Sequence, residues 1–136
     1  MSESEKLTGG CLCGAVRYEM TGPFRPIIVC HCGQCRKTHG DVAGYTGAKL
    51  VNFALTEQRG LKWFQSSDTA RRGFCGECGG SLFYEPAGTD RMSVAAGTID
   101  GKTGLKNAGH IFLAEKGDYY DLPTDGLPQH PHGWDE

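Results

Sequence analysis

The chain has 136 residues and a formal net charge of -2 at pH 7, and 38% of its residues are hydrophobic. This length predicts one domain, because two separate cores would need more chain. The charge balance gives no broad positive field, so we expect no nucleic-acid partner. No stretch approaches the roughly 18 apolar residues of a membrane span, so we expect no membrane partner. The polar N-terminus without an apolar signal region favours a cytoplasmic protein, and composition sets no oligomeric state.

Three parts of the chain are expected. Residues 1–8 are polar and predict a flexible lead-in, and the paired glycines that follow mark the entry to folded structure. We expect residues 9–131 to form a single domain and residues 132–136 to form a C-terminal tail.

Short strands dominate the expected secondary structure. In residues 16–20 apolar side chains alternate with charged ones, which is typical of a half-buried strand. Residues 26–29 form an apolar run, which predicts a buried strand that leads directly into Cys30. Apolar runs separated by turn residues occur at 43–55, 61–66, 80–84, 93–97 and 108–113. The one helix expected is residues 34–39, and the chain after Lys116 is expected to be extended over the surface.

Seven cysteines fall into three clusters, at residues 11–13, 30–35 and 75–78. Gaps of one or two residues between thiols are typical of metal chelation. Disulfides are disfavoured because the cysteine count is odd, the expected compartment is reducing, and neighbouring thiols such as Cys11 and Cys13 are too close for an unstrained bridge. Zinc is the expected metal because all-sulfur shells suit it, and iron is the alternative, although the usual cluster spacing is missing.

The outer two clusters predict a closed structural site. Cys11 and Cys13 chelate from one loop, and Cys75 and Cys78 chelate from a second loop more than sixty residues later. Two such pairs complete a four-thiolate shell, which holds distant segments together.

The middle cluster predicts a reactive site. Cys30, Cys32 and Cys35 can surround one ion from a single loop and leave its fourth direction open. The alternative is a closed structural site in which His39 supplies a fourth ligand. His31 lies between two of the cysteines and is expected to point away from the ion.

The expected chemistry is that of nucleophilic sulfur. A three-thiolate zinc unit carries negative charge, which makes it a poor source of hydroxide but suits it to hold a substrate thiol as thiolate at neutral pH. Arg36 and Lys37 could attract an anionic substrate, and the alternative is that both face solvent. No hydrolase motif is present. His110 is either a core-edge or a binding-site histidine, whereas Tyr119 and Tyr120 are more typical of packing.

Three ordered motifs carry a family resemblance. GGCLCGAVRY, CHCGQCRKTHG and FCGECGGSLFY follow one another along the chain. With them the chain resembles the glutathione-dependent formaldehyde-activating enzyme family, which includes the domain of centromere protein V. The resemblance implies an all-β fold of the β-tent type, with short antiparallel sheets organised by two zinc ions. It implies structural ligands at Cys11, Cys13, Cys75 and Cys78, and catalytic ligands at Cys30, Cys32 and Cys35.

The resemblance also implies an activity. The glutathione thiol would add to formaldehyde and give S-(hydroxymethyl)glutathione, so the chain is expected to be a carbon-sulfur lyase with a small thiol and an aldehyde as its partners. The alternative is a zinc-stabilised module that carries glutathione or binds another protein without catalysis. Nucleic-acid or cytoskeletal binding, by analogy with centromere protein V, is disfavoured by the net charge of -2.

Overall fold

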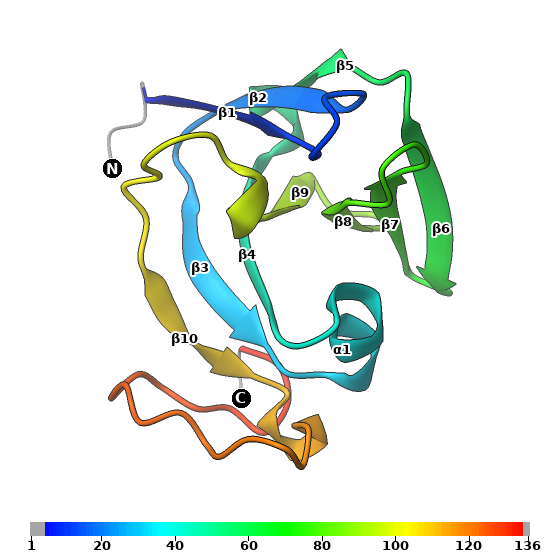
Figure 1. The fold of residues 1–136 in the computed structure, drawn as a ribbon. Coiled ribbons are helices and arrows are strands. Elements are labelled where there is room, and N and C mark those ends of the chain that lie inside the picture. Colours follow the sequence, from blue (N-terminus) through cyan, green and yellow to red (C-terminus); the bar gives the residue numbers. More distant parts are fainter. Residues whose placement is uncertain (1–4, 135–136) are drawn as a thin grey trace. The chain divides into compact units, whose positions relative to one another are not determined.

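The computed structural model describes residues 5–134, which consist mainly of short strands (Figure 1). The strands are β1 (Lys6–Gly10), β2 (Arg17–Thr21), β3 (Arg25–Cys30), β4 (Ala43–Lys49), β5 (Phe53–Glu57), β6 (Leu61–Ser67), β7 (Ala70–Cys75), β8 (Ser81–Pro86), β9 (Arg91–Ala95) and β10 (Asn107–Ile111). The helices in this part of the chain are α1 (Gly33–His39) and the 3-10 turns η1 (Leu50–Asn52), η2 (Ala96–Thr98) and η3 (Leu113–Glu115). The all-β prediction is confirmed, and so is the helix expected at residues 34–39.

The chain forms two compact units, and the division between them falls within β3 and β4. The first unit contains the described residues up to Arg25 together with Thr46–Gly104. The second unit contains Pro26–Tyr45 and the described residues from Leu105 onward. The assignment of residues 9–131 to one domain stays a prediction. Within residues 5–134, no helix has the length and apolar character needed to cross a membrane.

A three-stranded antiparallel sheet in the order β1-β2-β5 belongs to the first unit (Figure 1). The strand predicted at residues 16–20 is β2, and its alternation buries Tyr18 and Met20, each 1% exposed. Leu7 of β1 lies opposite Met20 and is also buried. The lead-in expected for residues 1–8 is wrong for residues 6–8, which belong to β1, and residues 1–4 lie outside the described part of the chain.

Four further strands of the first unit pair in the order β9-β8-β7-β6, and the pairs β8-β9, β7-β8 and β6-β7 are antiparallel. Leu82 and Phe83 on β8 and Val94 on β9 are almost completely buried. The Phe83 ring meets the Tyr18 ring edge-on, with 5.5 Å between their centroids. The two groups of strands therefore share a core, and this core supports the ends of β1 and β7, which lead into the outer cysteine clusters.

The second unit is built around β3 and β10, which run in parallel (Figure 1). This pair differs from the antiparallel sheets that were expected. Parallel strands need a long connection, and residues 31–106 provide it. The run at residues 26–29, predicted to be buried, is buried only at Ile28 and Val29, since Pro26 is exposed and Ile27 is half-buried. The strand delivers Cys30 at the point where α1 is about to begin. Gly40 ends α1 in a left-handed conformation with φ 85°, which a glycine adopts without strain.

The segment after Lys116 contains no helix or named strand up to residue 134, as predicted. It returns along β10 through main-chain hydrogen bonds. The N–H of His110 donates to the carbonyl of Pro128 at 2.9 Å, and the N–H of His130 donates to the carbonyl of His110 at 2.9 Å. The N–H of Phe112 also donates to the carbonyl of His132 at 2.7 Å. The start of the expected tail is thus attached to β10, and residues 135–136 lie outside the described part.

Candidate metal centres

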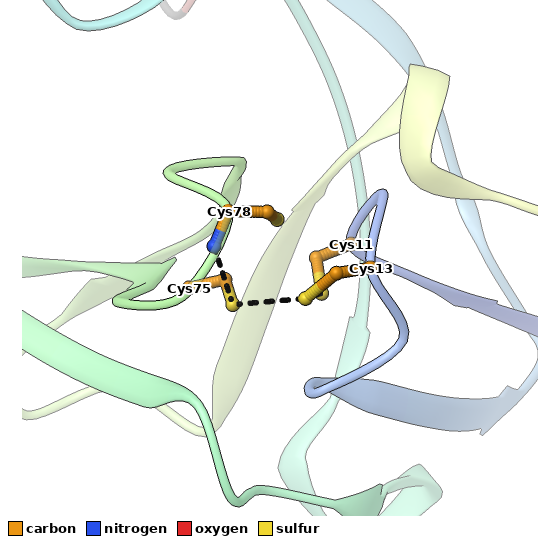
Figure 2. A group of neighbouring side chains, drawn as sticks. All are labelled: Cys11, Cys13, Cys75 and Cys78. Carbon is orange, nitrogen blue, oxygen red and sulfur yellow. Dashed lines mark hydrogen bonds between the residues drawn. The ribbon is translucent and has the colours of Figure 1, made fainter.

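Four cysteines of the first unit bring their sulfurs together. The ligand atoms of Cys11, Cys13, Cys75 and Cys78 all lie within 4.8 Å of one another (Figure 2). Cys13 Sγ is 3.7 Å from Cys11 Sγ and 3.7 Å from Cys75 Sγ. Sulfurs at about 2.3 Å from a tetrahedral zinc ion lie about 3.8 Å from one another. The four sulfurs therefore fit the dimensions and the donor chemistry of a zinc site.

Two glycines shape the turn that carries Cys75. The turn after β7 closes with a 2.8 Å hydrogen bond from the N–H of Gly79 to the carbonyl of Cys75, and Gly79 has a φ of 80°. Gly60 allows a close approach of a second segment, because a Cβ at this position would lie 2.8 Å from Cys75 Sγ. A side chain at either glycine would therefore disturb the position of this sulfur.

Main-chain N–H groups surround the sulfurs of this turn. The N–H groups of Glu77 and Cys78 donate to Cys75 Sγ at 3.3 and 3.4 Å. The N–H groups of Gly80 and Cys13 lower the pKa of Cys78 to about 6. Such hydrogen bonds favour the thiolate, which is the form that binds a metal ion.

The other three cysteines lie on one loop of the second unit. Cys30 ends β3, Cys32 caps the N-terminus of α1, Cys35 lies within α1, and their sulfurs are within 4.8 Å of one another. The N–H of Cys35 donates to Cys32 Sγ at 3.2 Å. Hydrogen bonds from the thiols of Cys30 and Cys35 lower the pKa of Cys32, and the same contacts raise the pKa of Cys30.

The two histidines nearest the triad have other partners. Both ring nitrogens of His31 are engaged, with Nδ1 2.7 Å from the Tyr120 hydroxyl and Nε2 2.9 Å from His110 Nδ1. His39 Nε2 is 2.7 Å from the Tyr45 hydroxyl. Among the described residues, no histidine, aspartate or glutamate places a ligand atom with the three sulfurs. This geometry favours the open three-thiolate shell over a shell closed by histidine.

A chain of four side chains runs behind the triad. It continues from Tyr120 and His31 through His110, whose Nε2 lies 2.7 Å from Asp125 Oδ2. His31 and His110 are only 3% and 5% exposed, and burial, followed by the charge of His110, lowers the pKa of His31. The hydrogen bond from His110 also lowers the pKa of Asp125, so this carboxylate is ionised at neutral pH.

The ionised carboxylate sets the direction of its own hydrogen bond with His110. Asp125 can only accept, so His110 donates from Nε2. His110 Nδ1 and His31 Nε2 share a hydrogen bond of 2.9 Å, and His31 Nδ1 shares one of 2.7 Å with the Tyr120 hydroxyl. Tyr120 and His110 therefore position His31, and with it residues 30–35, which carry the three cysteines and are called the metal loop below. Sequence reasoning missed Asp125 altogether, because it lies fifteen residues from His110 in no recognisable motif.

Arg36 and Lys37, which follow the triad, differ from each other in the structure. Arg36 Nη2 donates to the main-chain carbonyl of Glu115 at 3.3 Å, and the Glu115 carboxylate accepts from the N–H of Gly33 at 3.0 Å. Lys37 is exposed on the surface of α1. The expectation of a solvent-facing side chain thus fits Lys37, whereas Arg36 lies against the segment after β10.

The fold and the two centres define a class: a small all-β protein with two cysteine clusters suited to metal ions. The sequence profile of the family described as "Glutathione-dependent formaldehyde-activating enzyme" matches residues 6–115, and the chain belongs to this family. The match covers both clusters, and it confirms the resemblance seen in the three motifs.

The chain is similar to a named protein and to a solved structure. A protein of Halomonas elongata, named "Putative glutathione-dependent formaldehyde-activating enzyme", is 28% identical over an alignment of 134 positions, gaps included, which covers 87% of this chain and 82% of that protein. A crystal structure of a Rhodobacter sphaeroides protein matches with a TM-score of 0.58 and 25% sequence identity. That match covers 74% of this chain and 97% of the other.

Proposed function

We propose that the protein is a zinc-dependent carbon-sulfur lyase that joins glutathione, or a similar small thiol, to formaldehyde or a related aldehyde. The observation that carries this proposal is the triad of Cys30, Cys32 and Cys35, whose sulfurs gather without a histidine, aspartate or glutamate ligand atom from the described residues. A zinc ion bound there would lower the pKa of an incoming thiol, so that the nucleophilic thiolate exists at neutral pH. Membership of the family supports glutathione and formaldehyde as the reactants.

The reaction is an addition without redox change. A carbon-sulfur bond forms between the thiol sulfur and the carbonyl carbon, the carbonyl π bond breaks, and the proton lost by the thiol ends on the carbonyl oxygen. Cys30, Cys32 and Cys35 would hold the ion and leave one corner of its shell to the reactants. The effect expected from the protein is mainly proximity, because both reactants are held at one place.

The first-unit cluster has a different proposed role. Cys11, Cys13, Cys75 and Cys78 would bind a second zinc ion with all four corners filled by protein. Such a closed shell has no position for a substrate, so its contribution is to stability.

Exchange spectroscopy by NMR tests the proposed activity. Zinc-loaded protein is mixed with glutathione and formaldehyde, and the exchange rate between free and adduct carbon is compared with buffer, because the adduct also forms unaided. We expect acceleration by the wild type and none by Cys35→Ser, which should still retain the ion of the first-unit cluster. A wild-type rate equal to that of buffer would contradict the enzyme. Glutathione binding that persists in Cys35→Ser would instead support the non-catalytic carrier.

A further inference from the structure

The guanidinium of Arg36 lies at the metal loop of the second unit. Arg36 directly follows Cys35 on α1, and its side chain folds back over the loop, since Nη2 is 3.5 Å from the position that a Cβ on Gly33 would take. Gly33 itself lies between Cys32 and Cys35 in the sequence. A permanent positive charge is therefore held against the loop that carries Cys32 and Cys35.

A neutral group, not a carboxylate, holds this charge in place. Nη2 donates to the main-chain carbonyl of Glu115 at 3.3 Å, and Nε is buried without a hydrogen-bond partner. No ion pair of Arg36 occurs within residues 5–134. The guanidinium is thus oriented without an ion pair, and its Nη groups retain hydrogens that can be donated to a carboxylate.

The carboxylates of this region are occupied by uncharged donors. The Glu115 carboxylate accepts from the N–H of Gly33 at 3.0 Å. The Asp41 carboxylate accepts from the Tyr119 hydroxyl at 2.6 Å. Neither acid forms an ion pair with Arg36, although Glu115 Oε1 lies 3.7 Å from the same Gly33 position that Nη2 approaches, so Arg36 keeps hydrogen-bond donors for a molecule from solution.

We propose that Arg36 binds a carboxylate of the thiol substrate, so that the site selects anionic thiols over neutral ones. This inference rests on the proposed function, since it assumes that the thiol binds at the triad. Glutathione has two carboxylates and meets the requirement. The competing role for Arg36 is to offset the negative charge of three thiolates around a divalent ion, and that role would act on every thiol alike.

The test compares two thiols and three variants by calorimetry on zinc-loaded protein. Glutathione and its diethyl ester share the thiol and the peptide skeleton, but the ester has no free carboxylate. For Arg36→Gln we expect glutathione affinity to fall about tenfold, because one charge-assisted hydrogen bond at a partly solvated site is lost. The affinity for the ester, which has no carboxylate to lose, should stay within about twofold. Arg36→Lys should restore only part of the loss, because a lysine keeps the charge without the planar fork.

Lys37→Gln is the matched control, because it removes the same charge one position further along α1 from an exposed side chain. It should leave both affinities within about twofold of the wild type. Zinc content per chain, measured on each variant, must equal that of the wild type for the affinities to be compared. An equal loss for both thiols in Arg36→Gln, or a loss of zinc, would assign the charge-offset role and overturn the proposal.

The outcome separates this inference from the proposed function. If wild-type protein prefers glutathione to the ester through Arg36 but does not accelerate adduct formation, the carboxylate-binding role of Arg36 is supported and the lyase activity is refuted. If catalysis occurs but Arg36→Gln keeps the full preference for glutathione, the lyase activity is supported and the carboxylate-binding role of Arg36 is refuted. If wild-type protein binds neither thiol, the carboxylate-binding role of Arg36 is refuted.

Discussion

Replacing Tyr120 with phenylalanine should destabilise the protein, because it removes the hydroxyl group that forms a hydrogen bond with His31. The Tyr120 hydroxyl is 2.7 Å from Nδ1 of His31, whose side chain is 3% exposed. No tautomer of His31 repairs the loss, because a bare Nδ1 then lacks a donor and a protonated Nδ1 lacks an acceptor. A buried polar atom left in this way costs about 1–3 kcal/mol, and since the variant keeps the aromatic ring, we expect about 2 kcal/mol.

Urea unfolding followed by circular dichroism measures this cost. With a denaturant slope of about 2 kcal/mol/M, the midpoint of Tyr120→Phe should fall by about 1 M relative to wild type, both in zinc-containing buffer. Tyr119→Phe is the matched control, because Tyr119 is 61% exposed and its hydroxyl meets only the exposed carboxylate of Asp41. Its effect should stay within about 0.5 kcal/mol. Equal midpoints for the two variants would refute the reasoning that His31 depends on Tyr120.

Three more predictions concern the first unit. Cys75→Ser removes a completely buried sulfur and should leave one zinc ion per chain with a lower unfolding midpoint, so an unchanged zinc content by elemental analysis would contradict the four-cysteine site. Gly60→Ala should weaken zinc binding at the same cluster in a chelator competition, because the new Cβ would lie 2.8 Å from Cys75 Sγ; wild-type retention of both ions would count against this close approach. Burial raises the pKa of Tyr18 from 10.0 to about 12, so the unfolded chain releases this proton first as the pH rises. The unfolding free energy should therefore decrease between about pH 10 and pH 12 by roughly 2–3 kcal/mol more in wild type than in Tyr18→Phe, and parallel pH curves would argue against a buried hydroxyl.

Local patterns in the sequence predicted much of the fold, because they reflect local physics. Alternation in residues 16–20 predicted β2, and the apolar run at residues 26–29 predicted the strand that ends at Cys30. Cysteine spacing predicted which sulfurs would gather, and the structure brings together the same two groups. Chelate spacing is informative because two ligands on one turn can be placed without knowledge of the rest of the fold.

The parts that the sequence did not predict depend on long-range contacts. The parallel pairing of β3 with β10 and the hydrogen bonds from His31 to His110 and Tyr120 join residues about eighty or more positions apart. Neither histidine belongs to a motif that would indicate its partner. Arg36 and Lys37 looked equivalent as neighbouring cations, and only the position of the Glu115 carbonyl distinguishes them.

The hydrogen bond between His31 and Tyr120 has a consequence for the order in which the protein is made. A ribosome releases the N-terminal part first, and 89 positions separate these two residues. Cys78 completes the first-unit cluster well before Tyr120 and Asp125 are synthesised. The triad sulfurs are therefore synthesised well before the side chains that hold His31 in place, and we expect them to be more accessible to ions and oxidants during that interval.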